Sequence, residues 1–192
     1  MKRIALILFL VHFSAAATAQ QGGLSYNYLQ GSFGQVDVDD AGIDVDGDGL
    51  GISGLFAIDQ NFHLFGEYQT ADLDFGVDLN TWEFGVGYHS SMSPNLDVIG
   101  NLGYFNVELD APGFGSPDDG GLLVGLGLRG KVSSAVELYG GLDYVDFDDS
   151  DGETRAHAGF LLGLTPTFGL GLKLSLWDDF NIYQLNARIE FD

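Results

Sequence analysis

Apolar and polar residues alternate along much of the chain. From Phe168 to Trp177, every second residue is large and apolar, whereas glycine, lysine and serine occupy most of the positions between them. In a helix this order would spread leucine around the whole circumference, and each interior glycine would cost about 1 kcal/mol relative to alanine. In an extended strand the same residues form one apolar face and one small or polar face. The pattern therefore predicts a β-strand.

The same alternation, bounded by turn residues, recurs often enough to predict ten strands. No linker, low-complexity tail or second domain interrupts the series. The predicted strands are Leu24–Gln35, Gly49–Ile58, Phe62–Ala71, Thr81–His89, Leu96–Val107, Gly121–Val132, Val136–Val145, Thr154–Leu164, Phe168–Trp177 and Ile182–Phe191.

The connections between these strands fall into two classes. Those after the second, fourth, sixth and eighth strands are short and nearly uncharged. The other five contain or adjoin 20 of the 28 acidic residues. One end of the molecule is therefore expected to be short and almost neutral, and the other strongly acidic.

This asymmetry bears on what the apolar face contacts. A soluble barrel or sandwich with an inward apolar face is the alternative, but it would spread its carboxylates over solvent-facing strand positions. Short turns at one end, long loops at the other and an alternating apolar face are typical of a transmembrane barrel. About ten residues at ~3.3 Å each, tilted near ~45°, also span the ~25 Å apolar band of such barrels. We predict an all-β fold, a transmembrane antiparallel up-and-down β-barrel of ten strands, with eight strands as the alternative.

The first residues have the features of an export signal. Lys2 and Arg3 precede an apolar run, and Ala17, Thr18 and Ala19 form a small-residue cleavage site. The run is too short to span a bilayer as a helix. We expect a signal peptide over residues 1–19 and the barrel over residues 20–192, exported to the cell outer membrane.

Composition narrows the functional classes. A formal charge of −21 with only 7 lysines and arginines argues against nucleic acid as a partner. Glycine is abundant, with 29 residues, but 45% hydrophobic residues and 15 phenylalanines argue against disorder. The chain has no cysteine, so disulfide bonds do not contribute.

Several segments carry a resemblance to a known family. The segments "LSYNYLQGSF", "NFHLFGEYQ", "FGVGYHSSMSPNLDVIGNLGY" and "YQLNARIEFD" resemble small Gram-negative outer-membrane barrels of the diffusible-signal-factor-regulated type. More distantly, they resemble opacity-type and OmpX-type barrels. The last strand resembles the carboxy-terminal assembly signal of such barrels at Gln184, Ile189 and Phe191. It differs from that signal at Asn186, where glycine is usual, and at Asp192, which follows the aromatic residue.

The resemblance implies a location and partners rather than an activity. It implies contact with outer-membrane lipid and lipopolysaccharide, insertion by the barrel assembly machinery, and a monomeric barrel. The family has no single agreed biochemical activity, and the shared motifs carry no catalytic residue. No cofactor is expected on this basis.

One acidic stretch has half of a calcium-binding pattern. Asp44, Asp46 and Asp48 stand at positions one, three and five of an EF-hand loop, with Gly49 at position six. Leu55 stands where the bidentate glutamate of such a loop is required. We expect weak, low-specificity association of Ca²⁺ or Mg²⁺ here, in what is otherwise a solvated acidic loop.

Other polar and aromatic residues invite functional readings that the pattern does not favour. His89 with Ser90 and Ser91 would lie at the short-turn end, away from outer-leaflet lipid, and no carboxylate at a telling spacing orients the histidine. His157 could pair with Asp143 or Asp146 in a hydrolytic site, but nothing in the sequence fixes that geometry. His63 is interpreted as a polar residue at a strand end.

A set of aromatic residues is expected to form girdles at the two membrane interfaces: Tyr26, Tyr28, Trp82, Tyr88, Tyr104, Tyr144, Trp177 and Tyr183.

The basic residues are placed unusually. All five bases of the mature chain occupy inward positions of the predicted strands, and five acidic residues and one histidine do so as well. Because an unpaired buried charge is very costly, we predict an ion-paired, mostly occluded lumen. Its residues are Glu67, Glu83, Arg129, Lys131, Glu137, Asp143, Arg155, His157, Lys173, Arg188 and Glu190.

These patterns favour a non-enzymatic outer-membrane barrel with an envelope-structural, surface-interaction or adaptation role. A narrow porin-like channel for small solutes or ions is the alternative, because inward glycines leave space in the lumen. A loop-based outer-membrane hydrolase is a third reading.

Overall fold

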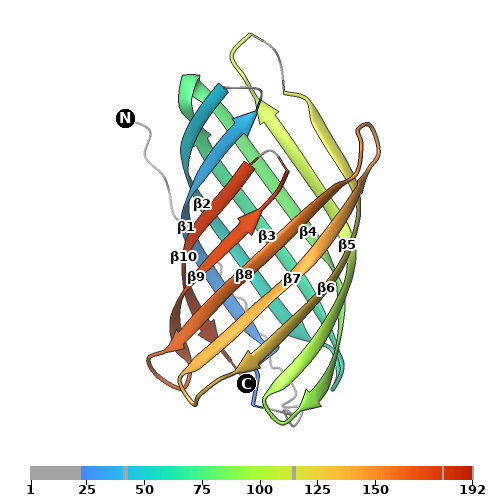
Figure 1. The fold of residues 1–192 in the computed structure, drawn as a ribbon, viewed down its shortest axis with the longest axis vertical. Coiled ribbons are helices and arrows are strands. Elements are labelled where there is room, and N and C mark those ends of the chain that lie inside the picture. The colour runs from blue at the N-terminus through green and yellow to red at the C-terminus, as the bar shows by residue number, and fades with distance from the viewer. Residues whose placement is uncertain (1–22, 41–42, 114–115, 179, 192) are drawn as a thin grey trace.

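The computed structural model describes residues 23–191 except 41–42, 114–115 and 179, and the side chains of residues 39, 40, 43 and 44 are also outside the description. Ten antiparallel strands make up nearly all of the described chain, with one short 3-10 turn, η1, between β3 and β4 (Figure 1). The bounds are β1 Tyr28–Asp40, β2 Ile43–Ala57, β3 Phe62–Leu73, η1 Asp74–Gly76, β4 Val77–Ser93, β5 Leu96–Asp110, β6 Asp118–Lys131, β7 Val136–Phe147, β8 Glu153–Gly163, β9 Phe168–Leu176 and β10 Phe180–Glu190.

The strands form a closed up-and-down barrel. Each strand pairs with its neighbours in the chain, and β1 pairs with β10 from Tyr28 opposite Glu190 to Val38 opposite Phe180. Closure gives every strand two hydrogen-bonded partners, which removes the exposed edges of an open sheet. The prediction of a ten-stranded barrel is confirmed, and the eight-stranded alternative is wrong.

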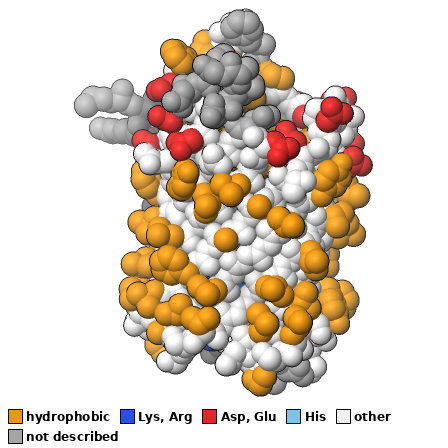
Figure 2. Space-filling view, in the orientation of Figure 1, with side chains coloured by type: hydrophobic (Ala, Val, Ile, Leu, Met, Phe, Trp, Pro, Cys, Tyr) orange, Lys and Arg blue, Asp and Glu red, His pale blue; other side chains and the backbone are white. Residues whose placement is uncertain are grey.

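Large apolar side chains cover the outer wall of the barrel. Leu126 is 65% exposed, Phe84 57% and Leu185 54%, and they alternate with residues that point into the lumen. Figure 2 shows hydrophobic side chains distributed over the flank of the barrel and acidic side chains gathered towards one end. Within the part of the chain that the structure describes, no helix is long and apolar enough to cross a membrane.

The two classes of connection lie at opposite ends of the barrel. The links β1–β2, β3–β4, β5–β6, β7–β8 and β9–β10 lie together at what we term the acidic end. The links β2–β3, β4–β5, β6–β7 and β8–β9, and the last described residue, Phe191, lie at the opposite, short-turn end (Figure 1). Each short turn is compact, as where the Asp59 carboxylate accepts hydrogen bonds from the Asn61 and Phe62 N–H groups.

Several strand boundaries differ from the prediction. The first strand starts at Tyr28 rather than Leu24, because residues 24–27 leave the barrel wall and turn into its mouth. The strands β1 and β2 also continue through much of the segment predicted as an acidic loop, pairing up to Asp40 opposite Ile43. The fourth strand runs to Ser93, so that only Pro94 and Asn95 form the following turn. The predicted signal peptide lies outside the described residues.

Candidate functional site in the barrel lumen

Inward side chains fill the lumen in layers, and β7 passes through all of them. From the acidic end, its inward residues are Phe147 and Val145, then Asp143, and finally Tyr139 and Glu137 near the short turns. The first two are apolar, Asp143 is ion-paired in the middle of the barrel, and Glu137 is ion-paired near the opposite mouth. The lumen therefore changes from apolar to charged along its length.

An apolar layer closes the lumen on the side of the acidic end. Phe105, Leu123 and Val145 are at most 4% exposed, and Trp177 is 8% exposed. Part of this layer comes from strand ends that the sequence pattern predicts as loops. The apolar layer is therefore not among the predicted features. Its members are Val36, Val38, Phe65, Ala71, Leu73, Leu79, Phe105, Val107, Leu123, Val145, Phe147, Trp177, Phe180 and Ile182.

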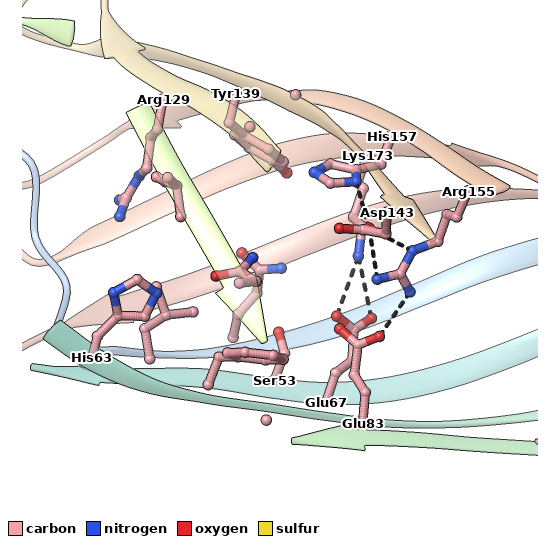
Figure 3. Close-up of a pocket in the computed structure, with 18 of the residues that line it drawn as sticks. Ser53, His63, Glu67, Glu83, Arg129, Tyr139, Asp143, Arg155, His157 and Lys173 are labelled. Carbon is pink, nitrogen blue, oxygen red and sulfur yellow. Dashed lines mark hydrogen bonds and ion pairs between the residues drawn. The ribbon is translucent and has the colours of Figure 1, made fainter. Parts of the chain in front are cut away.

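Beneath the apolar layer lies a group of charged residues that we term the central cluster: Glu67, Glu83, Asp143, Arg155, His157 and Lys173 (Figure 3). Arg155, on β8, contacts a carboxylate on the neighbouring strand β7 and another on β4, which is not a neighbour of β8. Its guanidinium lies 2.8 Å from the Glu83 carboxylate on β4 and 2.8 Å from the Asp143 carboxylate on β7. The Nδ1 atom of His157 lies 3.1 Å from the same Asp143 oxygen.

The remaining pair of the central cluster connects β9 to β3. The Lys173 ammonium lies 3.2 Å from the Glu67 carboxylate, which also accepts a hydrogen bond from the Gln69 amide. Above the cluster, the Arg155 guanidinium lies 5.3 Å from the ring centre of Trp177. This cation–π contact places the charged layer directly against the apolar one.

A second charged group, which we term the mouth cluster, consists of Arg129, Glu137 and Arg188. Glu137 accepts two hydrogen bonds from Arg129, at 2.8 and 3.0 Å, and one from Arg188 at 2.9 Å. All three side chains are at most 4% exposed. Arg188 also donates to the Gln30 side chain at 3.1 Å and lies 4.0 Å from the ring centre of Tyr28. The mouth cluster thus links three strands, because arginines on β6 and β10 share one buried carboxylate on β7.

A chamber of about 150 Å³, lined by both polar and apolar side chains, lies between the two clusters. Its lining includes Ser53, Asn101 and Tyr139 as well as charged side chains from both clusters (Figure 3). The side-chain oxygen of Asn101 is buried without a hydrogen-bond partner in the protein, and so are both polar atoms of the Asn186 side chain. Buried polar groups of this kind are commonly satisfied by water.

At the short-turn end, residues 23–27 enter the mouth of the barrel. We call them the mouth segment. Leu24, Ser25 and Tyr26 are 0%, 7% and 4% exposed. Most of this segment falls within the predicted first strand, Leu24–Gln35, so neither the segment nor its partner Asp97 was predicted as part of a site. One signal in the sequence could have indicated this contact. Asp97 is an acidic residue at an inward strand position with no evident basic partner, so it needs a hydrogen-bond donor from elsewhere.

The structure brings nine of the eleven predicted lumen residues into the two clusters. Lys131 and Glu190 are the exceptions: they point inward near the short-turn end and make no ion pair with another described residue. The Lys131 ammonium instead donates to the Gly23 carbonyl. The predicted ion pairing therefore takes the form of two separate groups, with a chamber between them.

The predicted aromatic girdle is wrong for three of its members. Tyr26 and Tyr28 point into the mouth, and Trp177 points into the apolar layer. They contact arginine side chains instead of lying on the outer wall. The others are on the outer wall: Trp82, Tyr88, Tyr104, Tyr144 and Tyr183.

The candidate calcium segment is extended. Residues 44–49 form part of β2, with Asp46 opposite Asp37 and Asp48 opposite Gln35. Alternation places the carboxylates of Asp46 and Asp48 on the outer side of the strand, whereas an EF-hand loop curls its ligands around the ion. Among the residues whose side chains are described, no group of three metal-ligating residues is positioned to hold a metal ion. The side chain of Asp44 is outside the description.

The histidines and the assembly-signal residues have defined surroundings. His89 and His63 lie with their Nδ1 atoms 3.2 Å apart in the mouth, where His63 is 1% exposed. Ser91 donates to Asp97 rather than to a histidine.

Of the predicted assembly signal, Gln184 faces the lumen, whereas Ile189 and Phe191 are on the outer wall, where Phe191 packs against Phe56.

Comparisons with known proteins agree with this architecture. Residues 5–168 match a family model described as the outer membrane protein beta-barrel domain. No curated protein matches the sequence. Among solved structures, the chain is similar to the β-domain of the Bordetella autotransporter BrkA, with 13% identity, a TM-score of 0.50, and coverage of 87% of this chain and 100% of that one.

Two further solved structures are similar to the chain with lower TM-scores. The KdgM porin in complex with disordered oligogalacturonate has 8% identity and a TM-score of 0.48, covering 86% of this chain and 99% of that one. The attachment invasion locus protein Ail of Yersinia pestis has 14% identity and a TM-score of 0.42, covering 88% of this chain and 100% of that one.

Proposed function

The chain belongs to the outer membrane protein beta-barrel domain family, and from this premise we propose that it is a non-enzymatic, non-conducting barrel that presents an acidic surface outside the cell. The short-turn end then faces the periplasm, as in barrels with short periplasmic turns and longer external loops. The role is envelope-structural or surface-interacting, and it is carried by the outer end of the barrel instead of by transport through it.

The observation that carries this proposal is the filled lumen. An apolar layer and two ion-paired clusters follow one another along the barrel axis, and the chamber between the clusters is small. A barrel of about eight strands is just filled by its own side chains, whereas porins of about 16 to 18 strands leave a water channel. Ten strands, packed in this way, are closer to the filled case.

The acidic end supports the surface role. Twenty of the chain's 28 acidic residues belong to or adjoin the connections at that end. Neighbouring lipopolysaccharide is itself anionic. Divalent cations that bridge such groups would associate weakly with the acidic end, and we propose Asp44, Asp46 and Asp48 as part of this low-specificity association. The same surface would repel anionic partners and attract cationic ones.

A narrow channel is the second candidate, and the chamber is the observation that favours it. Its lining includes charged and other polar side chains beside apolar ones, and inward glycines such as Gly127 add no side chain to its volume. A path for ions would still require the apolar layer to part, because that layer separates the chamber from the acidic end. We therefore rank the channel below the closed barrel.

Cells lacking the protein test the surface role against transport. We expect deletion to leave the uptake of small polar solutes unchanged and to make the cell surface less negative in electrophoretic mobility. Complementation with the wild-type gene should restore the mobility, and complementation with Asp146, Asp148, Asp149 and Asp151 all changed to asparagine should restore it less. Unchanged mobility together with reduced solute uptake would contradict the proposal and favour the channel.

A further inference from the structure

The mouth segment is held in place differently from the rest of the chain. Residues 24–27 have no strand structure, and the β1–β10 and β1–β2 ladders both begin at Tyr28. Even so, Leu24, Ser25 and Tyr26 are among the most buried residues of the protein. Contacts with lumen side chains, instead of a backbone ladder, therefore keep this segment inside the barrel.

Tyr26 makes the most specific of these contacts. Its ring stacks on the His89 imidazole, with centroids 3.5 Å apart and planes 5° from parallel, and the Arg129 guanidinium lies 5.0 Å from its centre. Its hydroxyl donates to the Asp97 carboxylate at 2.9 Å. Asp97 is itself 0% exposed and accepts a second hydrogen bond from Ser91 at 2.7 Å. The mouth thus contacts both the ring and the hydroxyl of the Tyr26 side chain.

Two bases hold the backbone of the same segment. The Arg129 guanidinium donates to the Ser25 carbonyl at 2.7 Å, and the Lys131 ammonium donates to the Gly23 carbonyl. Lys131 makes no ion pair with another described residue, and its ammonium binds the mouth segment instead. These hydrogen bonds satisfy carbonyl groups that no strand ladder serves.

Asn27 fixes the other end of the segment to the rim. Its side-chain oxygen accepts a hydrogen bond from the Ala57 N–H at 2.9 Å, and its carbonyl accepts one from the Phe191 N–H at 3.1 Å. Residues on the amino-terminal side of Asn27 can therefore leave the mouth without breaking the barrel ladders. The segment is anchored at one point and held by side chains elsewhere.

We propose that the mouth segment is a releasable stopper, pivoting at Asn27, that closes the chamber on the short-turn side. His63 and Arg129 line the chamber and also contact the Tyr26 ring, so the ring lies just outside the chamber wall. Release exposes the chamber wall at His63 and Arg129 to water and small polar solutes from one side only, because the apolar layer remains in place. The compartment on that side is the periplasm if the proposed function is correct, whereas the stopper itself does not depend on that orientation.

Cysteine labelling tests the stopper because the chain has no cysteine of its own. Ser53 lines the chamber and faces the lumen in Figure 3, so Ser53→Cys introduces a single thiol behind the mouth segment. The purified, folded protein in micelles is treated with a small cationic methanethiosulfonate reagent. We expect slow labelling in this background and labelling about tenfold faster or more when Tyr26→Ala is added, because both the stacked ring and a hydrogen bond to a charged acceptor are lost.

The matched control is Tyr183→Ala in the same background. Tyr183 is 48% exposed on the outer wall, so its removal should leave the labelling rate unchanged. Tyr26→Phe keeps the ring and loses only the hydroxyl, and it should give an intermediate rate. Folding of every variant is checked by its heat-dependent mobility on gels.

If Tyr26→Ala fails to fold, Lys131→Ala provides the second test. It releases the Gly23 carbonyl at the rim without creating a buried gap, and it should give a smaller rise in labelling. Equal rates for the Ser53→Cys background and its folded stopper variants would overturn the proposal. So would a background rate as fast as that of a cysteine at the exposed turn residue Ser134. Ion conduction by the wild-type protein would instead refute the closed barrel, so the two failures are distinguishable.

Discussion

Replacing Glu137 with glutamine should destabilise the barrel strongly. The carboxylate is the shared partner of Arg129 and Arg188 and is 3% exposed. Glutamine has nearly the same shape but no charge, and its amide NH₂ group would face guanidinium N–H groups as a second donor. Two buried arginines would then lack a counter-charge in a layer that water barely reaches.

The size of the effect follows from the burial. Removing one member of a buried ion pair costs about 3–5 kcal/mol, because the charge left behind is uncompensated. We therefore expect Glu137→Gln to lower the free energy of unfolding by about this amount. Guanidinium unfolding of the protein in lipid vesicles measures it through tryptophan fluorescence, to which Trp177 in the lumen and Trp82 on the outer wall both contribute. The midpoint should fall while the slope stays the same.

Glu190→Gln is the matched control. Glu190 also points inward near the short-turn end, but it is partly exposed and makes no ion pair with another described residue, so its change should stay within about 0.5 kcal/mol. Replacing Arg129, Glu137 and Arg188 together with Met, Leu and Met should recover most of the stability lost in the single variant, because no unpaired charge remains. A loss below about 1 kcal/mol for Glu137→Gln would refute the reasoning, since an exposed salt bridge contributes about that much or less.

Three further predictions address topology, packing and cations. An epitope tag at Asp149 should be accessible on intact cells and one at Asn61 should not, so surface labelling at Asn61 would reverse the proposed orientation. Gly85→Ala should cost about 1–3 kcal/mol in unfolding experiments, because its Cβ atom would collide with the Leu102 carbonyl, whereas Gly31→Ala should be tolerated because no atom lies within 4 Å of its Cβ position. Titration calorimetry should detect weak heat on adding millimolar Ca²⁺ or Mg²⁺, and a flat titration without any stabilisation would remove the cation proposal.

Most of the fold could be predicted from the sequence because a barrel wall has a strict period of two. Stretches such as Phe168–Trp177 allow only one extended phase, since a shift by one residue would send every leucine into the lumen. The stretch "LSYNYLQGSFG" does not have this property, because apolar and polar residues occupy both phases. Its amino-terminal part was therefore assigned to the wall, although Tyr26 turns into the mouth.

The lumen residues could be listed from the sequence, but their grouping could not. Alternation tells which side chains point inward, and the cost of buried charge indicates that they pair. It does not tell that Arg155, which lies opposite Asp143 on the neighbouring strand, also reaches Glu83, because β8 and β4 approach each other only across the lumen of the closed barrel. The apolar layer was missed for a related reason: acidic residues alternate with Val36 and Val38 in the sequence, and the mixture was interpreted as a loop.

The central claim is that side chains close the lumen, and single-channel recording of the purified wild-type protein in planar bilayers tests it most directly. The layers described above predict a membrane whose conductance stays at the baseline of a protein-free bilayer, with an established porin inserted under the same conditions as the positive control. Large, stable and reproducible conductance steps from the wild-type protein would contradict the closed lumen and establish the channel instead.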